Sequence, residues 1–197
     1  TTVNSSPTDI SGQGNHGTMV GATYSPVDKA FTFDGTDDYI RAETGFSGNQ
    51  SHTASFWVKP DVVDASTRMM AFISSNGGTN LGRSIMYINT SVGTVFDFRS
   101  KHIISATLPV VGQWLHLAFT YDSSNGATKM YMDGILKTDI TEVNASTTIN
   151  LVNGSLSIGT NHNSTEDFDG QISNPKIYSV ALEPSEVQKL YRLGRTG

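Results

Sequence analysis

The chain has 197 residues, a formal net charge of −5 and no cysteine. A chain of this length can bury a sizeable core as one domain without disulfide bridges. It contains no basic run and no stretch of about 20 apolar residues, which argues against nucleic acid as a partner and against membrane insertion. Gly (19 residues), Ser, Thr and Asn are abundant and charged residues make up only 16%, a mix typical of short strands joined by tight polar turns. We therefore predict a single all-β domain over residues 1–197.

The first half of the chain begins with a turn-rich segment and continues in short strands. Gly12, Gly14 and Gly17 mark residues 9–18 as a loop, because glycine adopts positive φ at little cost. The pair Asp34-Gly35 is a turn signal between two apolar runs. Runs rich in β-branched and aromatic residues predict strands at residues 30–33, 39–42, 53–59, 69–74, 84–89 and 94–99.

The second half contains the clearest hairpin signals and one helix. Asn125-Gly126 and Asp133-Gly134 each separate two apolar runs, which predicts a three-stranded meander over residues 113–139. Further strands are expected at residues 155–159 and 170–178. Pro184 suits a first helical position and Gly194 a helix end, so we expect one short C-terminal helix between them.

Short motifs recur along nearly the whole chain, at residues 9–18 (DISGQGNHGT), 31–35 (FTFDG), 37–40 (DDYI), 56–60 (FWVKP), 112–118 (GQWLHLA), 121–122 (YD), 131–134 (YMDG), 156–159 (LSIG), 168–172 (FDGQI), 177–182 (IYSVAL) and 186–187. In this order and spacing they resemble the LamG-like jelly-roll family of the concanavalin A-like lectin and glucanase class. The resemblance implies a two-sheet antiparallel jelly-roll sandwich. The fold hosts lectins, adhesion modules, carbohydrate-binding appendages of enzymes and viral structural proteins, and it does not choose among them.

Two features depart from the family pattern. Family members usually have one more strand before the loop at residues 9–18, and only eight residues precede Asp9 here, so we expect that strand to be missing or truncated. Many members also carry an acidic residue soon after the Gly-x-Ile step, where this chain has Ser173-Asn174-Pro175.

A catalytic role is not expected, because glycoside cleavage needs two carboxyl groups on either side of the bond. Catalytic members of the class carry Glu-x-Asp-x-x-Glu on one strand. The nearest match, at residues 166–171 (EDFDGQ), lacks the second Glu. There is also no cysteine nucleophile, no Gly-x-Ser-x-Gly motif and no phosphate-binding loop. We assign no catalytic residue.

Histidines and aromatic residues have both structural and binding interpretations. No two of the five histidines share a metal-binding spacing, and His116 is expected to be packed and hydrogen-bonded, whereas His162 lies in a loop that could face a ligand. Core packing is favoured for Trp57 and Trp114 over an exposed sugar platform. Such a platform would need at least two exposed aromatics from a less certain set, namely Tyr24, Tyr87, Phe96 and Tyr131.

Acidic turns give the best chemical lead. The aspartates in Gly-rich turns near the two chain ends are Asp9, Asp34, Asp37, Asp38, Asp167 and Asp169. Jelly rolls of this family commonly hold one structural Ca²⁺ where the ends meet, and Ca²⁺ takes 6–8 oxygen ligands. The predicted ligands are Asp9, Asn15, Asp34, Asp37 and Asp169. The alternative is that these aspartates only shape the turns.

Two functions fit these observations. The first is a non-catalytic glycan-binding or adhesion module of a surface, secreted or modular protein. The second is a structural module of a virion or filament that binds other protein chains. Both place the chain outside the cell, on a cell surface or in a virion, with a glycan or a protein surface as partner.

Overall fold

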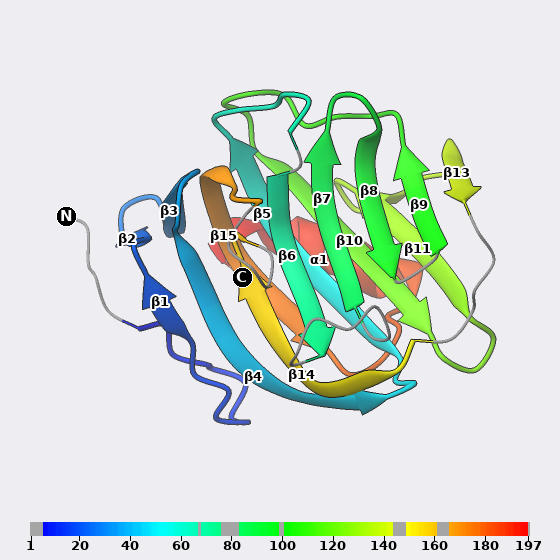
Figure 1. Ribbon diagram of the computed structural model, residues 1–197. Helices are drawn as coiled ribbons and strands as arrows, with labels where there is room; N and C mark the ends of the chain where they lie inside the picture. The colour runs from blue at the N-terminus through cyan, green and yellow to red at the C-terminus, as the bar shows by residue number, and fades with distance from the viewer. Residues whose placement is uncertain are drawn as a thin grey trace.

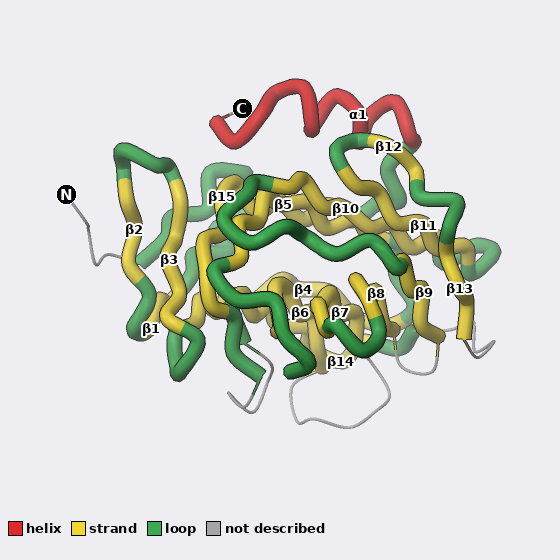
Figure 2. Tube along the Cα trace, turned by 90° about the horizontal axis from the view of Figure 1, so that it is seen from above, coloured by secondary structure: helices red, strands yellow, loops and turns green. Residues whose placement is uncertain are grey.

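The computed structural model describes residues 6–66, 68–75, 83–98, 101–143, 149–160 and 166–196. Two antiparallel sheets pack face to face, and one helix lies outside them (Figures 1 and 2). This confirms the predicted jelly-roll sandwich.

Each sheet draws its strands from both halves of the chain, as a jelly roll requires. The seven-stranded sheet has the spatial order β12 (Ile135–Leu136), β11 (Ala127–Met132), β10 (Leu115–Asp122), β5 (His52–Pro60), β15 (Asp169–Tyr178), β3 (Ala30–Asp34) and β2 (Thr23–Ser25). The eight-stranded sheet has the order β1 (Thr18–Val20), β4 (Tyr39–Gly48), β14 (Leu151–Ile158), β6 (Arg68–Ser75), β7 (Arg83–Asn89), β8 (Gly93–Phe98), β9 (Lys101–Ser105) and β13 (Ile140–Val143).

The core fills the space between the sheets with alternate residues of each strand. Phe56 on β5 and Phe119 on β10 point inward, because side chains alternate between the faces of a strand. Phe119 stacks on Phe96 of the opposite sheet with ring centroids 3.9 Å apart. Phe33 (1% exposed) and Ile158 (4% exposed) belong to the same cluster, as predicted.

The prediction that Trp57 and Trp114 pack in the core is wrong. Phe56 and Leu115 take the inner positions, so the tryptophan beside each is turned to the outer face of the seven-stranded sheet. Trp57 is half-buried and stacks on Tyr191 of the helix, with centroids 5.5 Å apart. Trp114 precedes β10 and is also half-buried, with the cationic groups of Lys59 and Arg195 at 5.6 Å and 4.3 Å from its ring centroid.

The helix α1 (Pro184–Leu193) has the predicted bounds and covers the outer face of the seven-stranded sheet (Figure 2). Its first turn is closed by a capping box, in which the Glu183 backbone N–H donates to the Glu186 carboxylate at 2.8 Å. Val187 is its one buried residue and packs on Ala118 and Tyr131. The described helices, α1 and the 3₁₀ turn η1 (Gly194–Thr196), are too short to cross a membrane.

Beneath this helix His116 is buried, which confirms that it is packed and hydrogen-bonded. Its Nε2 lies 2.9 Å from the Ser55 hydroxyl, and its ring contacts those of both Trp57 and Tyr191. Burial, with a smaller effect from the nearby Lys176 ammonium, lowers the pKa of His116 to about 4.

Two candidate sites at opposite ends of the sandwich

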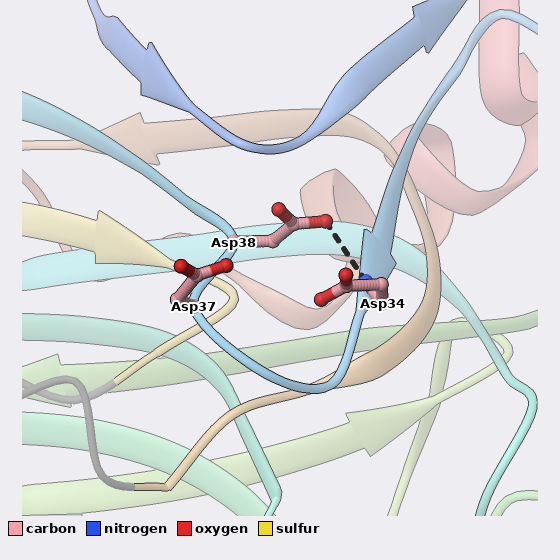
Figure 3. A group of neighbouring side chains, drawn as sticks. All are labelled: Asp34, Asp37 and Asp38. Carbon is pink, nitrogen blue, oxygen red and sulfur yellow. Dashed lines mark hydrogen bonds between the residues drawn. The ribbon is translucent and has the colours of Figure 1, made fainter.

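The first candidate site, here called the acidic end, is the turn between β3 and β4. One carboxylate oxygen each from Asp34, Asp37 and Asp38 lies within 4.8 Å of the others (Figure 3). The turn is held from within, because the Asp34 N–H donates to Asp38 at 2.9 Å and the Thr36 N–H donates to Asp34 at 3.0 Å. Gly35 adopts φ 76°, which a residue with a side chain rarely does.

Asp38 is the buried member of the acidic end, at 6% exposure. Burial raises its pKa above the ordinary value, and repulsion from Asp34, Asp37 and Asp167 adds to the rise. The hydrogen bond from the Asp34 backbone opposes this rise only in part. A bound cation or a proton would relieve the repulsion.

The structure divides the predicted calcium ligands between two places. Asp169 pairs with Asp34 across β15 and β3, and its Cβ would lie 2.9 Å from a Cβ added to Gly35. Asp9 instead closes its own loop by accepting hydrogen bonds from Ser11 and from the Asn15 backbone N–H, at 2.8–2.9 Å. Among the described residues, the three acidic side chains whose carboxylate oxygens lie within 4.8 Å of one another include Asp38, which was not predicted as a ligand. They include neither Asp9 nor Asp169, which were.

The donors at the acidic end fit calcium. Carboxylate oxygens are the hard ligands that Ca²⁺ prefers, and the backbone carbonyls of a tight turn can be added to them. Asp34, Asp37 and Asp38 would hold the ion, with Asp169 beside them. An ion there would fasten the β3–β4 turn to the start of β15.

The second candidate site, here called the end hollow, lies beyond the other ends of β4 and β15. It is a widely open depression of about 560 Å³, within the size range of small-ligand sites. Three separate segments line it. They are the end of β4 with the β4–β5 loop (Ser47 and residues 49–51), the end of β10 with the β10–β11 loop (residues 122–123), and the segment before α1 (residues 179–181).

Hydrogen bonds hold these loops together. The Tyr121 hydroxyl donates to Asn49 Oδ1 at 2.6 Å, and Asn49 Nδ2 donates to the Ser123 carbonyl at 3.3 Å. The hydroxyls of Ser51 and Ser123 lie 2.9 Å apart. Thr53 fixes the third loop by donating to the Val180 carbonyl at 2.8 Å. The hollow therefore has a preorganised frame.

A buried histidine, His52, joins the β4–β5 loop of the hollow to the opposite sheet. His52 Nδ1 lies 2.9 Å from the Gln50 carbonyl, and its Nε2 lies 2.8 Å from the hydroxyl of Ser84 in the opposite sheet. Burial lowers the pKa of His52 to about 4. The neutral ring thus ties the β4–β5 loop to β7.

Comparison with known families decides the class of the domain. Residues 34–188 match the Laminin_G_3 family model, described as the concanavalin A-like lectin/glucanases superfamily. The chain belongs to this family. The chain is also 26% identical over 151 residues to the rat "Sushi, von Willebrand factor type A, EGF and pentraxin domain-containing protein 1". This alignment covers 70% of the chain but only 4% of the rat protein.

Two solved structures show the same architecture. Domain 4 of AbnA, a GH43 extracellular arabinanase from Geobacillus stearothermophilus solved in complex with arabinotriose, is 26% identical, with a TM-score of 0.69, and covers 93% of this chain and 92% of that one. A heptameric SAP-like pentraxin from Limulus polyphemus is 15% identical, with a TM-score of 0.62, and covers 84% of this chain and 82% of that one. The second likeness concerns the fold alone.

The aromatic residues considered above as a possible sugar platform line neither site. Phe96 and Tyr131 are fully buried, and Tyr24 packs on Phe31 with centroids 5.0 Å apart. Tyr87 is half-buried on the outer face of the eight-stranded sheet, beside Ile85. His162 lies outside the described residues.

Sequence reasoning missed the end hollow altogether. Its polar residues are ordinary turn formers, and no local motif links the three loops. The signal that existed was the run of Ser, Gly, Asn and Gln at residues 47–51, where β4 ends. That run alone predicts a loop and no more.

Proposed function

We propose that this LamG-like domain is a non-catalytic glycan-binding module of an extracellular modular protein, with neutral oligosaccharides as ligands. The observation that carries the proposal is the 26% identity, over 93% of the chain, to a domain solved with arabinotriose. The preorganised polar hollow supports it, because sugar recognition relies on hydrogen-bonding groups fixed in advance.

The placement of the carboxylates supports the non-catalytic part of the proposal. Hydrolysis of a glycosidic bond needs an acid and a base or nucleophile that face each other across the substrate. Asp34, Asp37 and Asp38 come from one turn, and Glu183 and Glu186 form the capping box of α1. In the hexapeptide at residues 166–171, Phe168 is in the core and Asp169 is paired in β15.

The cation is the second part of the proposal. Ca²⁺ would bind at the acidic end through Asp34, Asp37 and Asp38, in a structural role. It would neutralise the repulsion that raises the pKa of Asp38. The end hollow lies at the other ends of β4 and β15, so we expect sugar binding to need no calcium contact.

A panel of neutral trisaccharides tests the function. Isothermal titration with arabinotriose, xylotriose, cellotriose and galactotriose should show saturable binding of at least one. Incubation with the corresponding polysaccharides should release no product. Binding of none of the four would contradict the proposal and favour a structural module that contacts other protein chains. Turnover that Glu166→Gln abolishes would contradict the non-catalytic assignment.

A further inference from the structure

We propose that the end hollow is the sugar subsite of this domain and that it takes a short segment of an uncharged oligosaccharide. The inference rests on the proposed function and deepens it by naming the place and the charge class of the ligand. Three observations carry it: the frame of the hollow, its uncommitted polar groups and its charge.

Some polar side chains of the hollow form the hydrogen bonds between its loops, and others are available to bind a ligand. Asn49, Ser51 and Ser123 are engaged in the hydrogen bonds that join the loops. The side chains of Ser47, Gln50 and Ser179 line the same hollow and make no hydrogen bond with any residue that the structure describes. Gln50 is held in place by its backbone, whose carbonyl is bonded to His52. A fixed backbone with a free side-chain amide is suited to bind hydroxyl groups.

The charge of the hollow selects against anions. Among the described residues that line it, Asp122 is the charged one, and none is a lysine or an arginine. Hydrogen bonds from the side chain and backbone of Ser124 hold the pKa of Asp122 below its usual range, so this carboxylate is ionised at neutral pH. An ionised carboxylate accepts hydrogen bonds from sugar hydroxyls and repels sugar acids.

The remaining lining supplies an apolar contact. Val180 and Ala181 border the hollow beside Ser179, and Val180 is 53% exposed. A sugar ring has a polar rim and a C–H face, so a ligand can bond to Gln50 and Asp122 while its C–H face covers Val180. Burial of that exposed side chain would favour binding.

Two substitutions in the hollow test the inference against a matched control. Ser179 is exposed, so Ser179→Trp fills the hollow without disturbing the core, and Gln50→Ala removes one free amide. Ser91 is also exposed, in the β7–β8 turn, and Ser91→Trp makes the same change away from the hollow. Each variant should melt within a few degrees of the original chain.

Titration of the neutral trisaccharide that binds best gives the decisive comparison. Ser179→Trp should weaken binding at least tenfold and Gln50→Ala about fivefold, which corresponds to one lost hydrogen bond, whereas Ser91→Trp should change it less than twofold. Trigalacturonate, an anionic trisaccharide, should bind at least tenfold more weakly than the neutral one.

The outcomes separate this inference from the proposed function. Binding by the original chain with unchanged affinity in Ser179→Trp and Gln50→Ala would overturn the hollow as the subsite and leave the glycan-binding function standing. Equal affinity for trigalacturonate would overturn the assigned charge class. Binding of no trisaccharide would overturn the proposed function, and the inference would fall with it.

Discussion

The two ends of the sandwich should respond to acid in opposite directions. At the acidic end the pKa of Asp38 is raised, so the folded state takes up a proton more readily than the unfolded chain and gains stability as pH falls through that pKa. At the hollow end the pKa of His52 is lowered to about 4, so the unfolded chain takes up the proton first and the fold loses stability as pH falls below about 6.5. At the acidic end neighbouring carboxylates repel one another, whereas the end hollow depends on a buried histidine that must stay neutral.

The largest expected effect tests how firmly the acidic end is anchored to the core. Phe33 directly precedes Asp34, is 1% exposed and packs on Phe168 with centroids 6.2 Å apart. Phe33→Ala should lower the free energy of unfolding by about 3–5 kcal/mol, because it leaves a cavity between the sheets. Chemical denaturation measures this loss.

Phe31→Ala is the control for that change, since Phe31 lies on the same strand but is only half-buried. It should cost clearly less. Equal losses for the two variants would show that the acidic end does not depend on the packing of Phe33.

The second effect separates the two ends by pH. His52 should account for a loss of about 3 kcal/mol between pH 7 and pH 4, and His116, whose pKa is also about 4, should add to it. His52→Gln is expected to be less stable than the original chain at pH 7 but to lose less stability on acidification. Urea unfolding at the two pH values measures both.

If His52→Gln lost as much stability as the original chain between pH 7 and pH 4, the buried neutral ring would not be the cause.

The third effect concerns the cation at the acidic end. With Ca²⁺ about 100-fold above its dissociation constant, the fold should gain about 2.7 kcal/mol, seen as a higher melting temperature than in chelator. Asp38→Asn should abolish most of this gain, because it removes a carboxylate from the group. Asp9→Asn should retain it, because Asp9 closes a separate loop.

These variants distinguish the acidic end from the ligand set predicted by sequence. A calcium response lost in Asp9→Asn and kept in Asp38→Asn would favour the sequence-based set. A melting temperature that calcium leaves unchanged in the original chain would leave the aspartates as turn formers.

The smallest effect concerns the frame of the end hollow. Tyr121→Phe removes the hydroxyl that holds Asn49 and should cost about 1 kcal/mol of stability. It should also weaken sugar binding a few-fold if Asn49 orients the loop. Tyr178→Phe, on the outer face of β15, is the control and should leave binding unchanged. Equal binding by the two variants would show that Tyr121 does not position the hollow.

The contrast between the ends also explains what the sequence could predict. The acidic turn and the hairpin at Asp133-Gly134 are local, since their residues are adjacent and the backbone needs positive φ, here 49° and 73° for that pair. The helix bounds were equally predictable, because Pro184 and Gly194 mark them. Each of these features depends on a few neighbouring residues.

Features that depend on pairing between distant segments were not predictable. The strands β1, β2, β9 and β13 were missed, because three to five residues of mixed polarity carry little periodicity. The direction of Trp57 was also ambiguous, since Phe56 beside it is equally apolar and only one of two neighbours can face the core. The end hollow needs three loops that only the folded sheets bring together.

Chemical-shift mapping tests the central claim most directly, because it needs no substitution. Titration of the ¹⁵N-labelled chain with its best-binding neutral trisaccharide should shift amide signals at residues 47–51, 122–124 and 179–181 and leave those of the acidic end, residues 34–38, unchanged. Saturable shifts confined to the acidic end or to the outer face of the eight-stranded sheet would contradict the assignment of the hollow as the sugar subsite.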